Sequence, residues 1–128
     1  MAVILIVEDD AMLCLEAEAA LQEWGHETLV ASDVDGALSI IRSAQKIDVL
    51  FTDIYLKTEP RGGCDLAREA IRLRPDLRVL YVTGYTLTAQ VRALFVEGAR
   101  CLGKPYADNT LKESIQALLA ENADSAAT

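Results

Sequence analysis

The sequence predicts an α/β fold in which a five-stranded parallel sheet is doubly wound by five helices. Short apolar runs that suit strands alternate with stretches whose apolar residues recur at helical spacing. One helix separates each strand from the next, which is the kind of connection that parallel strands need. The runs at residues 3–7 and 49–51 are almost wholly apolar, as expected for strands covered on both faces.

Five strands can be placed along the chain by their apolar runs. They are expected at about residues 2–8, 27–31, 47–53, 77–83 and 99–103. The second is shorter and more polar than the first and the third, which is typical of a strand at the edge of a sheet.

Five helices fill the intervals between and after these strands. Four are expected at about residues 11–24, 64–74, 87–97 and 108–121, and one more begins after residue 32 or 33. Asp10 can cap the first helix, and Ser32 or Asp33 can cap the second. Pro75 stops the third. The fourth, at 87–97, has the least regular apolar spacing, so we expect it to pack loosely.

Length, charge and cysteine content restrict the function classes. The 128 residues suffice for one domain, expected at residues 1–121 and followed by a disordered tail at 122–128. The net charge of −8 disfavours direct binding to nucleic acid. The sequence shows neither an apolar run of membrane-spanning length nor a secretory signal. Cys14, Cys64 and Cys101 match neither a zinc site nor a disulfide framework, so we expect reduced thiols in a cytoplasmic protein.

Polar side chains follow four of the apolar runs, at the points where the predicted strands end. Glu8 and Asp9 follow the first run, Asp53 the third, Thr83 the fourth and Lys104 the fifth. The carboxyl ends of parallel strands share one edge of a sheet, where open α/β sheets bind ligands. Carboxylates suit a divalent metal, and an ammonium group suits a phosphoryl oxygen. The sequence therefore predicts a site for a metal ion and a phosphoryl group.

Each of these residues also has a simpler interpretation when it is taken alone. Glu8 and Asp9 could be charges at a helix start, which the helix dipole favours. Thr83 could be an ordinary strand residue, because threonine is common in strands. Asp53 could cap a loop, but a carboxylate directly after a buried strand needs a partner. Lys104 is the partner that the sequence offers, so the functional interpretation is preferred.

Taken in order, these residues make the chain resemble the receiver domain of bacterial two-component response regulators over about residues 2–120. The family pattern has an acidic pair, an Asp, a Gly that opens the third helix, a Thr or Ser, and Lys-Pro. This sequence supplies those parts as Glu8-Asp9, Asp53, Gly63, Thr83 and Lys104-Pro105. The resemblance implies a flavodoxin-like receiver fold with strand order 2-1-3-4-5.

The resemblance also implies a metal site with Mg²⁺ as the cofactor. Asp9, Asp53 and the backbone carbonyl of Tyr55 would bind the ion directly. Glu8 would act through a bound water molecule. Hard oxygen ligands of this kind suit Mg²⁺, and the ion relieves the repulsion between clustered carboxylates.

The implied function is signalling, with Asp53 as the residue that accepts the phosphoryl group. Lys104 would bind an oxygen of the transferred group, through a Lys104–Pro105 peptide expected to be cis, and Thr83 would bond a phosphoryl oxygen afterwards. The expected partners are a sensor histidine kinase or a histidine phosphotransfer protein, and a protein downstream. Tyr55 stands two residues after Asp53, where a phosphatase would need a second acid. We therefore expect a stand-alone phosphoacceptor that catalyses only its own phosphorylation and dephosphorylation.

The sequence departs from the family pattern at three places. Cys101 stands where receivers usually have Tyr or Phe, so the usual aromatic switch cannot operate. Lys57 replaces a common proline, and the loop at 54–62 is longer than usual, so we expect this loop to be more mobile. The segment at 81–85 is similar to the signature of a subgroup called FAT GUY, whose members are mostly stand-alone receivers that lack the switch aromatic.

Two alternative functions stay open on the sequence alone. One is a flavin-binding or redox domain of flavodoxin-like fold, because residues 83–86 look a little like a flavin-phosphate loop. The other is a receiver-like interaction module that is never phosphorylated. The complete set of acids and the lysine argue against the second alternative.

Overall fold

The computed structural model describes residues 1–57, 59 and 61–127, with side chains to residue 120. Its five strands are β1 (Val3–Val7), β2 (Glu27–Ala31), β3 (Val49–Asp53), β4 (Arg78–Thr83) and β5 (Arg100–Gly103). All neighbouring pairs are parallel, and the order is β2-β1-β3-β4-β5. The predicted fold class and strand order are confirmed.

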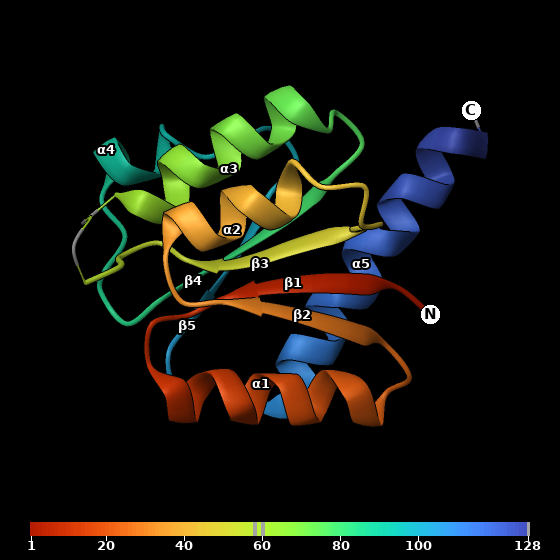
Figure 1. Ribbon diagram of the computed structural model, residues 1–128, viewed down its shortest axis with the longest axis horizontal. Helices are drawn as coiled ribbons and strands as arrows, with labels where there is room; N and C mark the ends of the chain where they lie inside the picture. The colour runs from red at the N-terminus through yellow and green to blue at the C-terminus, as the bar shows by residue number, and fades with distance from the viewer. Residues whose placement is uncertain (58, 60, 128) are drawn as a thin grey trace.

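Five helices cover the two faces of the sheet (Figure 1). They are α1 (Ala11–Glu23), α2 (Val34–Ile41), α3 (Gly62–Leu73), α4 (Ala89–Arg92) and α5 (Asp108–Ala127). Helices α2 and α3 lie on one face, and α1 and α5 lie on the other. No helix among the described residues combines the length and the apolar composition needed to cross a membrane.

Each face of the sheet has its own apolar core because successive strand residues point to opposite sides. Leu5 and Leu50 pack in the cluster under α2 and α3, whereas Ile4 and Phe51 pack in the cluster under α1 and α5. Every residue of β1 and β3 is buried as a result. Strand β2 has no fully buried residue and lies at the end of the strand order, which confirms it as an edge strand.

Side chains cap the first two helices as the sequence predicts. One carboxylate oxygen of Asp10 accepts hydrogen bonds from the amides of Met12 and Leu13, at 3.0 and 3.1 Å. Asp33, and not Ser32, caps α2 by accepting a hydrogen bond from the Gly36 amide at 2.7 Å. These caps fix the points at which the chain leaves β1 and β2.

Helix α4 is shorter than predicted: it spans only Ala89–Arg92, so the expected range of 87–97 is wrong. Beyond it, backbone amides bond carbonyls three residues back, as in a tighter turn. The amide of Val96 then donates to the hydroxyl of Tyr81 on β4 at 3.1 Å. The buried ring of Tyr81 also stacks on Phe95, with ring centroids 4.2 Å apart. The helix ends because a side chain of the sheet takes a backbone donor that continuing the helix would use.

Helix α5 extends further than the expected end at residue 121. Its backbone is helical to Ala127. The predicted disordered tail at 122–128 includes residue 128, which lies outside the described residues. The disorder of the tail, and the domain boundary at residue 121, stay predictions.

Candidate functional site

A hollow of about 780 Å³ opens at the carboxyl edge of the sheet. Glu8 and Asp9 enter it from the end of β1, Asp53 from the end of β3 and Lys104 from just beyond β5. The structure therefore brings four of the predicted site residues together, although they are up to 96 positions apart in the chain.

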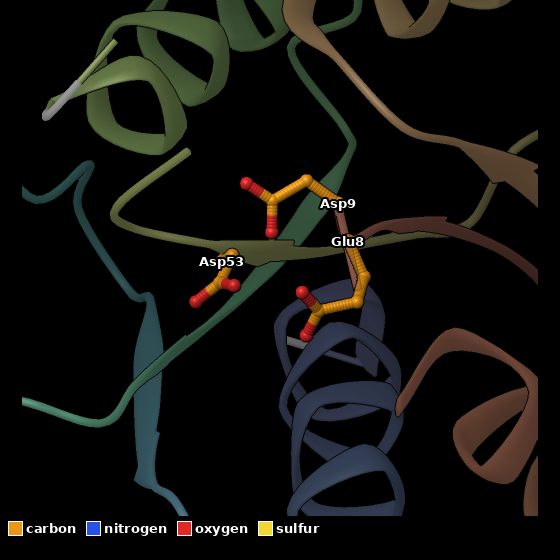
Figure 2. A group of neighbouring side chains, drawn as sticks. All are labelled: Glu8, Asp9 and Asp53. Carbon is orange, nitrogen blue, oxygen red and sulfur yellow. The ribbon is translucent and has the colours of Figure 1, made fainter. Parts of the chain in front are cut away.

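Figure 2 shows the three acidic side chains gathered at the ends of β1 and β3. Glu8, Asp9 and Asp53 each offer a carboxylate oxygen, and these oxygens lie within 4.8 Å of one another. Glu8 and Asp53 are buried, and Asp9 is partly buried. Three hard oxygen donors at this spacing fit a small divalent cation such as Mg²⁺.

Lys104 lies between two of these carboxylates. Its ammonium nitrogen is 2.8 Å from Oε1 of Glu8 and 2.9 Å from Oδ2 of Asp53. When all four side chains are ionised, the three negative charges exceed the single positive charge by two. A divalent cation matches that excess, so the charge of the cluster agrees with its donor atoms.

The protonation of Asp53 depends mainly on its burial. Removal from water raises the pKa of Asp53 to about 7, which the hydrogen bond from Lys104 opposes and the neighbouring Glu8 reinforces. Burial by itself lowers the pKa of Lys104, but the hydrogen bonds and charges of Glu8 and Asp53 outweigh that effect and raise it. Lys104 therefore stays charged beside a carboxylate that titrates near neutral pH.

The start of helix α3 holds the backbone of Asp53 in place. The amide of Gly63 donates to the carbonyl of Ile54 at 3.0 Å. A Cβ atom at Gly63 would lie 1.9 Å from the carbonyl oxygen of Asp53, so this position has no room for a side chain. This lack of space explains why the family pattern has a glycine at the position of Gly63. The helix begins at Gly62, two residues earlier than the sequence indicates.

The loop after β3 contacts the site through its backbone. Leu56 and Glu59 exchange two backbone hydrogen bonds, of 2.9 and 3.2 Å, that close a turn. Within this turn the amide of Lys57 donates to Oδ2 of Asp9 at 2.7 Å. The only sequence signal for this contact is that Lys57 replaces a common proline and therefore carries an amide; nothing in the sequence identifies Asp9 as its partner. The predicted mobility of the loop stays a prediction.

Thr83 and Tyr55 lie at the border of the site. The Thr83 hydroxyl is buried and accepts a hydrogen bond from the Tyr85 amide at 3.0 Å. Thr83 is absent from the described residues that line the hollow, but Gly84, Tyr85 and Tyr55 are among them. The rings of Tyr55 and Tyr85 meet edge to face, with centroids 4.8 Å apart. The expected cis peptide at Lys104–Pro105 is confirmed, whereas the Tyr55 carbonyl as a metal ligand stays a prediction.

The comparison with protein families identifies this arrangement. The family model described as the response regulator receiver domain matches residues 4–116. The chain belongs to this receiver domain family. Among solved structures, it superposes on a CheY-like receiver domain protein from Methanospirillum hungatei with a TM-score of 0.87 and 26% identity, covering 98% of both chains. A receiver protein from Sinorhizobium medicae gives a TM-score of 0.86 at 26% identity, covering 94% of this chain and 96% of that one.

Curated proteins of two different lengths are similar to this receiver. The transcriptional regulatory protein ZraR of Escherichia coli is 29% identical over 118 residues, which are 91% of this chain but 26% of ZraR. The response regulator receiver protein CpdR of Brucella abortus is also 29% identical over 118 residues, covering 91% of this chain and 95% of CpdR. The chain thus spans about a quarter of the length of ZraR, the relative that it matches first.

Membership of the family decides the general class of function. The receiver domain family consists of signalling phosphoacceptors rather than classical enzymes. The family match supports this interpretation over the flavin-binding alternative. The FAT GUY subgroup and the cytoplasmic location stay predictions.

Proposed function

We propose that this receiver accepts a phosphoryl group on Asp53 from a phosphohistidine, in a reaction that depends on Mg²⁺. The donor would be a sensor histidine kinase or a histidine phosphotransfer protein, and the phosphorylated receiver would bind a downstream protein or pass the group on. The observation that carries the proposal is the position of Asp53. Its carboxylate lies 2.9 Å from the Lys104 ammonium and within the cluster of three acids.

Asp53 acts as the nucleophile in this proposal. As a carboxylate oxygen of Asp53 bonds to phosphorus, the bond from phosphorus to the histidine nitrogen breaks and an acyl phosphate forms. The fixed backbone at Gly63 supports this role, because phosphoryl transfer depends mainly on positioning and charge stabilisation. The ionised form of Asp53 is required, and a pKa of about 7 leaves that form well populated at neutral pH.

Asp9, Asp53 and the carbonyl of Tyr55 would hold Mg²⁺ directly. Glu8 suits a role through water, because Lys104 contacts one of its carboxylate oxygens and the amide of Asp10 donates to the other at 3.1 Å. When bound, Mg²⁺ supplies positive charge that stabilises the oxygens of the transferring phosphoryl group.

Lys104 and Thr83 would bind phosphoryl oxygens at different stages. Lys104 already points at Asp53, so it would stabilise the charge of the group during transfer. The Thr83 hydroxyl now accepts a bond from the Tyr85 amide, and its own hydrogen can be donated to the phosphoryl group once that group is on Asp53. That rearrangement would draw in the chain at Gly84 and Tyr85.

Incubation with acetyl phosphate and Mg²⁺ tests the proposal. The intact mass should increase by one phosphoryl group in the wild type, and Asp53→Asn should abolish the increase. Asp10→Asn is the matched control, because Asp10 lines the same hollow but caps α1. Phosphate located on another residue would overturn the assignment. An unmodified protein after treatment with both acetyl phosphate and a set of phosphorylated kinases would favour the interaction-module alternative.

A further inference from the structure

Strand β2 leaves one edge of the sheet open. It pairs with β1 alone, and bonds at its two ends show which of its residues face β1. The amide of Glu27 donates to the carbonyl of Ala2 at 2.9 Å, and the carbonyl of Ala31 accepts from the amide of Glu8 at 3.1 Å. Backbone groups of alternate residues in a strand point to opposite edges. The amides and carbonyls of Thr28 and Val30, which lie between these ends, therefore point away from the sheet.

A second hollow, of about 760 Å³, lies against this edge. Helices α1 and α2 stand on opposite faces of the sheet, with β2 at the edge between them (Figure 1). The hollow is lined by Leu15 of α1, Val30 of β2 and Ile40 of α2. Leu15 is 59% exposed and Val30 is 45% exposed. The open backbone edge is thus accompanied by apolar side chains that water contacts.

The charge around this hollow has a single sign. Glu18 and Asp33 line it, as do Glu8 and Asp9 at the end near the phosphorylation site. Lys, Arg and His are absent from the described residues of its lining. Glu18 is held in place by the hydroxyl of Thr28, which donates to its carboxylate at 3.0 Å and accepts from Gln22 at 2.9 Å.

We propose that the open edge of β2 binds an extended segment of a partner protein that carries both basic and apolar side chains. An extended chain would pair its backbone with Thr28 and Val30, as in strand addition to a sheet edge. Its apolar side chains would contact Leu15 and Val30, and its basic ones would face Glu18 and Asp33. A second copy of this chain fits poorly, because it would bring the same acids to the contact and has a net charge of −8.

Binding of short peptides to the full chain tests the proposal. The buffer contains Mg²⁺, which competes with the lysines of a peptide for the acidic cluster of Glu8, Asp9 and Asp53. The probe is a capped peptide of alternating lysine and valine. One control replaces the valines with glycine and keeps the charge, and another replaces the lysines with glutamate. We expect the lysine–valine peptide to bind about tenfold more tightly than either control. Amide hydrogen exchange at Thr28 and Val30 should slow in the complex.

Two variants and one control locate the binding surface. Leu15→Lys and Val30→Lys should each weaken binding of the lysine–valine peptide about tenfold, because each removes an apolar contact and adds charge repulsion. Met12→Lys should leave its affinity unchanged, because Met12 is 63% exposed on the same helix but is not part of the lining. Equal affinity for all three peptides would overturn the proposal, and so would unchanged exchange at Thr28 and Val30. An equal loss in Met12→Lys would do the same. None of these measurements depends on phosphorylation of Asp53.

Discussion

The two halves of the carboxyl edge of this receiver are built differently. In the half formed by β1 and β3, Asp53 is only 4% exposed. Its carboxylate contacts the ammonium group of Lys104, and its backbone packs against Gly63. In the half formed by β4, α4 and β5, the helix has four residues and Cys101 is only partly buried. The first half contributes the acids of the family pattern, Glu8, Asp9 and Asp53. The second half contributes Thr83 and Lys104, but it has Cys101 where the family resemblance predicts an aromatic residue.

This difference predicts that, under the proposed function, phosphorylation chemistry and signal output can change separately. A thiol cannot swing inward as a ring does, and burial raises the pKa of Cys101 to about 11, so the thiol stays neutral. In the same half, Tyr81 stacks on Phe95 and bonds the Val96 amide. The aromatic contacts of the half formed by β4, α4 and β5 therefore come from β4 and the segment after α4, rather than from β5.

The largest expected effect concerns Lys104, which follows β5 and contacts Asp53 in the first half. Lys104→Ala should preserve the fold but slow phosphorylation by acetyl phosphate by about 10²- to 10³-fold, because one fixed positive charge is lost. The rate of mass increase measures this. Lys57→Ala is the control: Lys57 lines the same hollow, but it contacts Asp9 through its backbone amide. Equal rates in the two variants would remove Lys104 from the mechanism.

The next effect is on the stability of the first half. Gly63→Ala should lower the free energy of unfolding by about 3 kcal/mol, because its methyl group would overlap the carbonyl of Asp53. Gly103→Ala is the control, since a Cβ atom there meets nothing within 4 Å. Urea unfolding of both variants measures the difference. Similar midpoints would show that the contact at Gly63 relaxes easily.

Metal binding should distinguish the two acids that follow β1, Glu8 and Asp9. Asp9→Asn should weaken Mg²⁺ binding about 100-fold, because it removes a charged direct ligand. Glu8→Gln should weaken it only about tenfold, as expected for a group that acts through water. Titration followed by tyrosine fluorescence measures both, because Tyr55 and Tyr85 line the hollow. Undiminished affinity in both variants would contradict the metal site.

A smaller effect tests the second half of the edge, which is formed by β4, α4 and β5. Tyr81→Phe should lower the free energy of unfolding by about 1 kcal/mol, because the Val96 amide loses its partner. Amide exchange at Val96 should become faster. Tyr85→Phe is the control, since that ring is 69% exposed. Unchanged exchange at Val96 would mean that the hydroxyl of Tyr81 does not hold this segment.

A separate effect is a dependence of stability on pH in the absence of divalent cations. Burial raises the pKa of Asp53 from its ordinary 3.8 to about 7, so between these values the folded chain binds more protons than the unfolded chain. The contribution of Asp53 to stability is therefore complete below the lower value and is lost as the pH rises through the upper one. Melting temperatures across this range should fall more steeply in the wild type than in Asp53→Asn. Parallel curves would mean that Asp53 titrates at its ordinary pKa.

The sequence predicts the first half of the edge better than the second. Strands β1 and β3 are recognisable because burial on both faces favours the apolar runs at residues 3–7 and 49–51. The acids Glu8 and Asp9 come just after β1, and Asp53 ends β3. The cap at Asp10 is recognisable because it acts on its immediate neighbours. The end of α4 is not, because it depends on a hydroxyl 15 positions away in the chain. The contact between Lys57 and Asp9 also escapes prediction, since it uses a backbone amide.

The contact between Gly63 and Asp53 has a consequence for how the loop between them can change. The chain is anchored on one side by β3 and on the other by the Gly63 amide, which bonds the carbonyl of Ile54. Changes of length between Lys57 and Gly63 leave the backbone of Asp53 held at both of these anchors, and they leave the contact between the Lys57 amide and Asp9 outside the altered segment. The length of the loop beyond Lys57 is therefore free to diverge, and other sequences could be grafted there without moving the backbone of Asp53.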